Sequence, residues 1–257
     1  MSCCISPADD TEEYDLLLNN YNSQLLACCN CDQACLKITC KCLQFLQGDN
    51  YEKYTYNGKV SFILLDVFIT YPIIECNSNC SCLPDCGNRV VQNGPAEGLL
   101  VLPCTDKKGL GLFTSQYIHK GTFICEYAGE LLTKTQAVAR SKENETKGKM
   151  NYIFCVNEHT TGGIVQTFVD PSQFGNIGRY LNHSCDPNCK IIPVRVETVI
   201  PKLAIFACRD ILPHEELTFH YGASDGADSQ SEDTGSKRKQ CLCKASSCSG
   251  YMPFDQF

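Results

Sequence analysis

Nine cysteines in the first third of the chain have a spacing that suits shared zinc ions. The first group is Cys29, Cys31, Cys35, Cys40 and Cys42, and the second is Cys76, Cys80, Cys82 and Cys86. Structural zinc is tetrahedral, so three zinc ions would need twelve bonds to sulfur. Nine thiolates supply twelve bonds if six of them bind one ion and three of them bridge two. The spacing therefore predicts a three-zinc cluster built from these nine side chains.

A further zinc site is indicated near the C-terminus. There Cys241, Cys243 and Cys248 offer three ligands and need a fourth from elsewhere. Most of the other cysteines stand in apolar runs, as packed thiols do. They are Cys3, Cys4, Cys28, Cys104, Cys125, Cys155, Cys189 and Cys208. Because Cys28 adjoins Cys29, the register of the first group stays open by one residue.

The composition favours an intracellular zinc protein over a secreted disulfide scaffold. Cysteine supplies 21 of the 257 residues, an odd count that would leave a free thiol in an all-disulfide protein. The first fifteen residues are acidic and have no basic n-region, so we expect no signal peptide. The apolar runs are too short to span a bilayer. The net charge of -7 makes direct nucleic-acid binding a poor expectation and favours a basic partner.

The pattern along the chain predicts a β-rich domain over residues 98–222. Its clearest apolar runs are Gly98–Leu102, Thr122–Tyr127, Tyr152–Val156, Ile164–Val169 and Lys202–Ala207. A helix is expected over Gln136–Lys147, because Thr133 and Gln136 form a capping box ahead of a stretch without Gly or Pro. The cysteine-rich region carries an insertion, Leu43–Glu75, with a strand-like run at Val60–Thr70.

Two segments are expected to add little to the packed core. Residues 1–27 are acidic and polar with one short apolar patch, so we expect an arm that packs weakly. Residues 223–239 are rich in serine, aspartate and glycine, which predicts a flexible linker.

Three segments of residues 98–222 resemble the SET domain of protein lysine methyltransferases. They are Lys108–Gly111, Gly178–Cys185 and Glu215–Gly222, and Cys125–Glu130 is also typical of that family. The nine cysteines resemble the family's pre-SET module, and the C-terminal triad resembles its post-SET module. Other segments resemble a branch of the family in which the SET portion is fused to a transposase. These are Phe168–Pro171, Gly175–Arg179 and Ile192–Arg195.

The resemblance implies a mainly β fold, a knot-like SET domain of the β-clip type between two zinc modules. It divides the chain into an N-terminal arm (1–27), a pre-SET module (28–97), a SET domain (98–222), a linker (223–239) and a post-SET tail (240–257). Cys185, in the Asn-His-Ser-Cys motif, would supply the fourth ligand of the C-terminal zinc site, with a buried thiol as the alternative. The chain would then hold four structural zinc ions.

S-adenosyl-L-methionine is the cofactor that the resemblance implies. Positions used by the family for cofactor contacts hold Lys108, Gly109, Leu110, Gly111, Tyr152, Arg179, Asn182 and His183. Gly109 and Gly111 would let the main chain approach a ligand closely, although alone they indicate a simple turn. Leu110 departs from the aromatic residue that many relatives carry. For His183 we expect a main-chain and structural role.

Tyr221 is the expected catalytic residue, because its phenol could orient a lysine amine toward the methyl group. Tyr152 would line the same channel, and core packing is the alternative for both tyrosines. Phe219 stands where the family sets the product state, and its lack of a hydroxyl predicts di- or trimethylation. His220 replaces the aspartate that is usual between these aromatic residues.

The resemblance thus implies a histone H3 lysine methyltransferase that binds the H3 tail and acts on chromatin in the nucleus. Lysine 9 is favoured because the nine-cysteine module accompanies that specificity, and lysine 36 is second because of the transposase-fused branch. The departures at Leu110 and His220 keep another hypothesis open, in which a catalytically weak SET module serves as a chromatin-binding scaffold.

Overall fold

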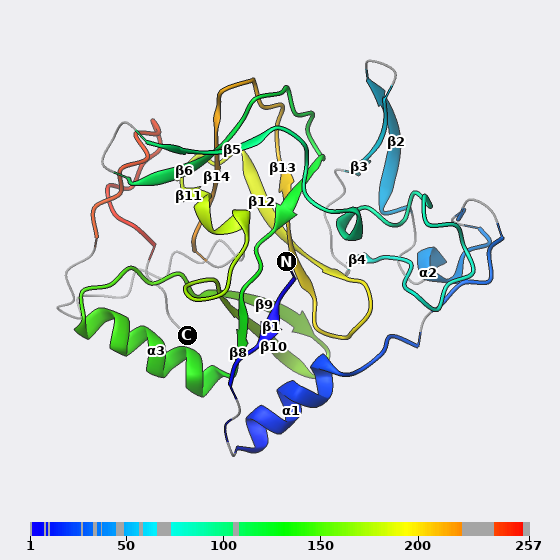
Figure 1. The fold of residues 1–257 in the computed structure, drawn as a ribbon, viewed down its shortest axis with the longest axis horizontal. Helices are drawn as coiled ribbons and strands as arrows, with labels where there is room; N and C mark the ends of the chain where they lie inside the picture. Colours follow the sequence, from blue (N-terminus) through cyan, green and yellow to red (C-terminus); the bar gives the residue numbers. More distant parts are fainter. Residues whose placement is uncertain are drawn as a thin grey trace.

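The computed structural model describes most of the chain and is built mainly of strands (Figure 1). The described residues are 2–7, 9, 11–26, 28–32, 35–36, 38–44, 49–56, 59–65, 73–104, 108–222 and 239–253. Within them the strands form three four-stranded sheets and one two-stranded hairpin. No helix in this part of the chain has the length and apolar character needed to cross a membrane.

The sheets are made of short strands, in the following orders. The first contains β1 (Cys4–Ile5), β8 (Glu130–Leu132), β10 (Gly163–Asp170) and β9 (Phe154–Thr160). The second contains β11 (Asn182–His183), β14 (Glu216–Phe219), β6 (Leu110–Thr114) and β5 (Leu99–Pro103). The third contains β4 (Ile73–Ile74), β12 (Cys189–Arg195), β13 (Lys202–Ala207) and β7 (Phe123–Glu126), and β2 (Tyr51–Tyr56) pairs with β3 (Lys59–Leu64).

The helices are few and lie outside the sheets (Figure 1). They are α1 (Glu12–Tyr21), α2 (Lys41–Gln44) and α3 (Lys134–Thr146), with 3-10 turns at Val91–Asn93 and Ile177–Tyr180. Thr133 and Gln136 form the expected capping box at the start of α3. The predicted helix is therefore confirmed, and it begins two residues earlier than expected.

The predicted β strands are confirmed, and their inward faces form the core. The run Lys202–Ala207 coincides with β13, whereas the run predicted from Tyr152 begins as β9 only at Phe154. Strand β13 buries successive residues, and strand β14 buries alternate ones. The fully buried aliphatic side chains include Leu112, Ile124, Leu181, Leu203 and Leu217.

The N-terminal arm packs closely on the sheets, so the expectation of weak packing is wrong. Strand β1 pairs in parallel with β8, and Tyr14 of α1 is buried. The Tyr14 hydroxyl donates to the Ser6 carbonyl over 3.1 Å. The sequence could not reveal this, because β1 is stabilised by a sheet edge supplied from more than 120 residues away.

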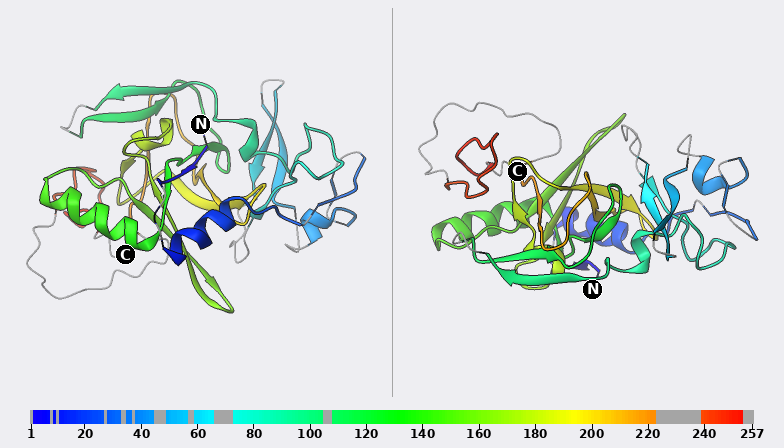
Figure 2. Two further views of the ribbon diagram at one scale, coloured as in Figure 1. Left: turned by 60° about the horizontal axis from the view of Figure 1, so that its bottom comes forward. Right: turned by 90° about the horizontal axis from the view of Figure 1, so that it is seen from above.

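The insertion in the cysteine-rich region forms the β2–β3 hairpin, which docks on the third sheet (Figure 2). The Leu64 amide donates to the Gly121 carbonyl over 2.7 Å, and the rings of Tyr51 and Phe206 stack with their centroids 6.3 Å apart. The predicted strand at Val60–Thr70 is confirmed through Leu64, and residues 66–70 lie outside the described residues. Residues 223–238 of the predicted linker also lie outside them.

Gly121 gives a test of this docking. Its φ is +81°, and a Cβ there would lie 2.6 Å from the Leu64 carbonyl oxygen. Gly148, just after α3, also has a left-handed φ of +63°, but a Cβ there would meet no atom within 4 Å. We expect Gly121→Ala to lower the free energy of unfolding by about 2–4 kcal/mol and Gly148→Ala by about 1 kcal/mol, measured by urea denaturation. Equal losses in the two variants would contradict the docking.

Candidate active site and metal centres

A cavity of about 400 Å³ brings most of the predicted cofactor and catalytic residues together. Its size lies within the range typical of cofactor sites. It is lined by the predicted residues Lys108, Gly109, Leu110, Tyr152, Arg179, Asn182, Phe219 and Tyr221. Six further residues that were not expected from the sequence also line it, and these are Tyr127, Met150, Asn151, Ile153, Phe154 and Tyr180. Tyr127 lies in the Cys125–Glu130 segment, and the resemblance of that segment to the family could have identified it as a site residue.

The parallel pairing of β11 with β14 brings two of the predicted motifs together at this cavity. Asn182 lies opposite Thr218, and His183 lies opposite Phe219. Two segments that are more than 30 residues apart in the sequence therefore meet side by side. Tyr221 follows β14 directly, so it enters the same place.

Tyr221 is held by two hydrogen bonds at the cavity wall. Its hydroxyl donates to the Leu181 carbonyl over 2.8 Å, and its amide donates to Nδ1 of His183 over 3.2 Å. Burial, with a smaller effect of His220, lowers the pKa of His183 to about 4. His183 is therefore neutral near pH 7 and can accept that bond. It lies behind the cavity and does not line it.

An aromatic cluster surrounds Phe219, which is buried. Its ring centroid lies 4.8 Å from that of Tyr221, 5.8 Å from Tyr127 and 5.5 Å from Phe154. The Tyr127 hydroxyl donates to the Tyr152 carbonyl over 2.6 Å, which fixes the segment that enters β9. The cluster forms a narrow apolar wall in which an added hydroxyl would have to find a partner.

Glu216 organises the other side of the cavity. Lys108 forms an ion pair with it at 2.6 Å, and the Asn182 amide donates to it over 2.8 Å and to the Leu110 carbonyl over 3.1 Å. A Cβ at Gly111 would lie 3.0 Å from the Glu216 carboxylate and 2.6 Å from the Cys104 sulfur. Gly111 therefore permits these side chains to pack and does not line the cavity.

Gly109 leaves room for a ligand in the cavity, and Arg179 contacts the aromatic side chains beside it. Gly109 has a φ of +84°, and a Cβ there would meet nothing within 4 Å, so space is open above it. The Arg179 guanidinium lies 5.3 Å from the Tyr152 ring centre and 5.7 Å from that of Tyr180. Such cation–π contacts hold aromatic side chains in place. The cavity thus fits a polar cofactor.

The two departures from the family pattern lie at the edges of the site. Leu110 is exposed and lines the cavity, where it offers an apolar surface without an aromatic ring. His220 is exposed and does not line the cavity, and its ring centroid is 4.9 Å from that of His183.

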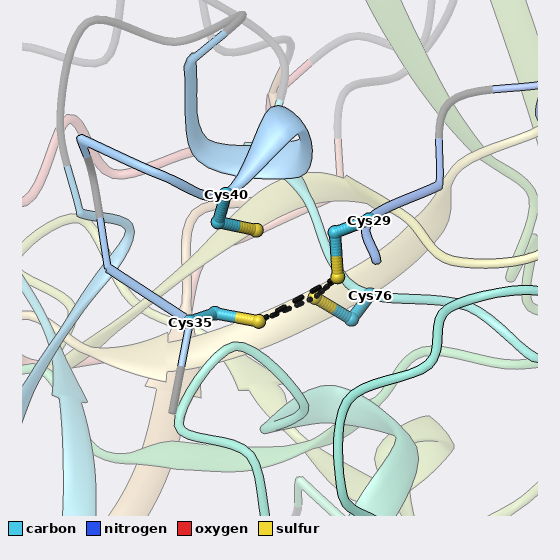
Figure 3. Close-up of side chains that lie close together, drawn as sticks. All are labelled: Cys29, Cys35, Cys40 and Cys76. Carbon is cyan, nitrogen blue, oxygen red and sulfur yellow. Dashed lines mark hydrogen bonds between the residues drawn. The ribbon is translucent and has the colours of Figure 1, made fainter. Parts of the chain in front are cut away.

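The first cysteine cluster has the geometry that zinc requires. Zinc–sulfur bonds of about 2.3 Å in a tetrahedron place the sulfurs about 3.8 Å apart, whereas a disulfide would join them at about 2.05 Å. The sulfurs of Cys29, Cys35 and Cys76 form a triangle with sides of 3.6, 3.7 and 4.0 Å. Figure 3 shows these three and Cys40 with their sulfurs turned toward one another. All 21 cysteines are free of disulfides.

Overlapping groups of sulfurs, which contain eight of the nine cysteines, show how three ions could share ligands. The groups are Cys29, Cys35, Cys40 and Cys76; Cys29, Cys42, Cys76 and Cys80; and Cys35, Cys76, Cys82 and Cys86. Cys29, Cys35 and Cys76 each occur in more than one group, as bridging ligands would. Burial and the adjacent thiols raise the pKa of Cys35 well above its usual range, so its sulfur needs a nearby cation to stay ionised.

The four cysteines expected to bind the C-terminal zinc ion also come together. Cys185, Cys241, Cys243 and Cys248 bring their sulfurs within 4.8 Å of one another, and Cys185 lies 3.9 Å from both Cys241 and Cys248. Nε2 of His183 lies 3.4 Å from the Cys185 sulfur, so the neutral ring can support this ligand from behind. Residues 239–253 are thereby brought beside the sheet that carries the cavity (Figure 1).

Comparison with known families gives two matches that cover most of the chain. Residues 109–222 match the SET domain and residues 10–89 match the Pre-SET motif. The chain is 44% identical over 227 residues to the human histone-lysine N-methyltransferase SETMAR, an alignment that covers 86% of this chain and 32% of that relative. It is 40% identical over 230 residues to the probable histone-lysine N-methyltransferase set-23 of Caenorhabditis elegans, covering 88% of this chain and 86% of that relative.

Solved structures share the fold. The methyltransferase domain of human SETMAR superposes with a TM-score of 0.77 and 38% identity, covering 99% of this chain and 88% of that one. A complex of KRYPTONITE with mCHH DNA, an H3(1-15) peptide and SAH superposes with a TM-score of 0.73 and 25% identity, covering 98% of this chain and 46% of that one. These matches confirm the resemblance and the fold class expected from the sequence. The chain belongs to the SET-domain family of histone-lysine N-methyltransferases.

Proposed function

We propose that this protein transfers methyl groups from S-adenosylmethionine to a lysine of histone H3. The observation that carries the proposal is the single cavity in which Tyr221, Phe219 and Tyr152 meet Lys108, Arg179 and Asn182. Aromatic side chains and a phenol suit a lysine side chain, and the polar groups with open space above Gly109 suit a charged cofactor. The family membership of the chain supports the same reaction.

The chain's own residues would prepare the lysine amine for an in-line attack. S-adenosylmethionine, when bound, supplies a methyl group on a positively charged sulfur. Deprotonating an ordinary lysine near pH 7 costs about 4–5 kcal/mol. The apolar wall around Phe219 disfavours the charged amine and so lowers this cost. Because the Tyr221 hydroxyl donates its proton to the Leu181 carbonyl, it would act toward the lysine amine as an acceptor of an N–H and so orient the lone pair of the amine.

The cofactor would be held mainly by the polar side of the cavity. We assign cofactor contacts to Lys108, Gly109, Leu110, Tyr152, Arg179 and Asn182, with His183 and Gly111 acting from behind. Glu216 would orient Lys108 and Asn182 for this task, since it contacts both.

For the substrate, we favour the H3 tail and lysine 9, with lysine 36 second. The net charge of -7 suits a basic tail. The KRYPTONITE complex holds an H3 peptide of residues 1–15, a span that contains position 9 and not position 36. Relatives named as histone-lysine N-methyltransferases support action on chromatin in the nucleus. The absence of a hydroxyl at Phe219 supports a di- or trimethylated product.

The scaffold hypothesis rests on Leu110 and His220 and makes a different prediction. A scaffold would bind S-adenosylmethionine without turnover, whereas the proposed enzyme also methylates H3. Calorimetric binding and product mass spectrometry on the same preparation separate the two.

We assign the zinc ligands as one cluster and one separate site. In the cluster, Cys29, Cys35 and Cys76 would bridge. The terminal ligands would be Cys31, Cys40, Cys42, Cys80, Cys82 and Cys86. Cys31 is outside the tight sulfur groups, but burial and the neighbouring Cys29 raise the pKa of its thiol to about 11. This proximity supports its assignment to the first of the three ions. The separate site would use Cys185, Cys241, Cys243 and Cys248.

Zinc analysis tests this assignment through two cysteine variants. We expect about four zinc ions in the wild type, about one in Cys76→Ser and about three in Cys248→Ser, because Cys76 bridges within the cluster and Cys248 serves one ion. The measurement is zinc per chain by elemental mass spectrometry. A wild type with zinc near zero or one would exclude the cluster.

Removing the Tyr221 hydroxyl tests the catalytic assignment. We expect Tyr221→Phe to lower kcat for H3 methylation by about 100-fold or more, because the amine loses its orienting partner. Cofactor affinity, measured by calorimetry, should change by less than about threefold. Tyr21→Phe, on helix α1, is the matched control. Full activity in Tyr221→Phe would remove this tyrosine from the mechanism.

Adding a hydroxyl at Phe219 tests the product state. In Phe219→Tyr the new hydroxyl would crowd the amine and hydrogen-bond to it, so we expect mainly monomethylated peptide where the wild type gives di- or trimethylated peptide. Mass spectrometry of the peptide after complete reaction reads the result. An unchanged distribution of products would show that other residues limit the number of methyl groups.

A further inference from the structure

A carboxylate from the N-terminal arm caps the start of helix α3. Glu13 accepts hydrogen bonds from the amides of Lys134, over 2.6 Å, and Thr135, over 3.3 Å. These are the first two residues of α3, and their amides have no partner within the helix. A negative charge at a helix N-terminus is also favoured by the helix dipole. Glu13 is 121 residues away from Lys134 in the sequence, so this contact joins two distant parts of the chain.

The arm that presents Glu13 is itself firmly attached to the same region. Strand β1 pairs with β8, the strand that precedes α3. The Ser6 hydroxyl donates to the Gln136 side chain over 2.7 Å, and the buried Tyr14 hydroxyl donates to the Ser6 carbonyl. Helices α1 and α3 lie next to each other along the lower edge of the molecule in Figure 1. The Glu13 carboxylate is therefore carried by a segment that is itself packed against β8 and the start of α3.

The far end of α3 carries one wall of the cavity. The segment Met150–Phe154 lines the cavity and follows the helix after a short turn. The Lys149 amide donates to the Asn144 carbonyl over 2.8 Å, and the Asn151 side chain contacts Ser141 over 3.4 Å. Ile153 packs with Ala137 of α3 in one buried cluster. A shift of α3 would therefore move this wall.

We infer that Glu13 is a positioning residue for the cofactor side of the cavity, an inference that rests on the proposed function. It fixes the axial position of α3, and α3 in turn fixes the segment that contains Tyr152. Tyr152 contacts Arg179 and faces the cavity, so the effect of Glu13 should appear in cofactor affinity. Glu13 itself touches neither the cavity nor any reacting atom.

Two neighbouring glutamates provide a matched pair of variants for the test. Glu13→Ala removes the cap, and Glu12→Ala removes the same charge from an exposed position one residue earlier. We expect Glu13→Ala to raise the Kd and KM for S-adenosylmethionine by about three- to tenfold, with kcat within about twofold of wild type. Glu12→Ala should leave all three values unchanged. Calorimetry and steady-state kinetics on the zinc-loaded chain, well below its unfolding temperature, give these values.

A variant on the helix side separates positioning from general stability. Proline is tolerated at the first position of a helix, so Lys134→Pro removes the amide that donates to Glu13 without breaking α3. We expect Lys134→Pro to weaken cofactor binding and to reduce the further effect of Glu13→Ala. Hydrogen exchange should rise at residues 149–154 in Glu13→Ala and stay unchanged in β13.

Three outcomes would overturn either the inference about Glu13 or the proposed function. Wild-type cofactor affinity in Glu13→Ala would overturn the inference and leave the proposed function intact. A lower kcat with unchanged KM, in step with a smaller folded fraction, would likewise overturn it, because a merely structural role gives that result. A wild type that binds no S-adenosylmethionine would overturn the proposed function itself.

Discussion

The site depends on one short stretch of parallel strand pairing, between β11 and β14. Two residues on each strand are in register, and the Ser184 amide extends the pairing to the Phe219 carbonyl over 3.1 Å. The buried Asn188 side chain reinforces it, because it accepts from the Thr218 amide over 2.8 Å and donates to the Glu216 carbonyl over 2.8 Å. This pairing brings the asparagine–histidine motif beside Phe219 and Tyr221.

The two cysteine clusters are connected to the SET domain on either side. On one side, the Glu75 carboxylate is buried and accepts from the Tyr51 hydroxyl and from the amides of Val90 and Val91. Burial and Glu75 raise the pKa of Tyr51 well above its usual value, so the phenol stays a donor. Because Glu75 adjoins Cys76, this network links the first cluster to the hairpin that docks on β13. On the other side, Cys185 lies two residues beyond β11.

Much of this arrangement could be predicted because its signals are local. The cysteine spacing, the capping box at Thr133 and the apolar run of β13 each lie within a short stretch of sequence, and each is confirmed as a sulfur cluster, a helix start or a strand. The cavity residues could be identified only by their resemblance to motifs of the family. The positions of Lys108 and Asn182 in the sequence do not by themselves show that these residues meet.

The features that sequence reasoning missed depend on contacts between distant segments. Tyr127 and Phe154 stand in runs that look like ordinary core strands, and only the folded chain puts them beside Phe219. The acidic composition of the arm suggested a solvated segment, yet the charge of Glu13 is used at the start of α3. Gly111 looked like a ligand contact, whereas its lack of a side chain makes room for Glu216 and Cys104.

Methyl transfer by the wild-type protein, from labelled S-adenosylmethionine to H3 peptides, tests the central claim most directly. One peptide should span lysine 9 and the other lysine 36, and mass spectrometry should locate the label. We predict label on lysine 9, carried as two or three methyl groups. No label on either peptide or on whole H3, from protein that holds its zinc and binds the cofactor, would contradict it.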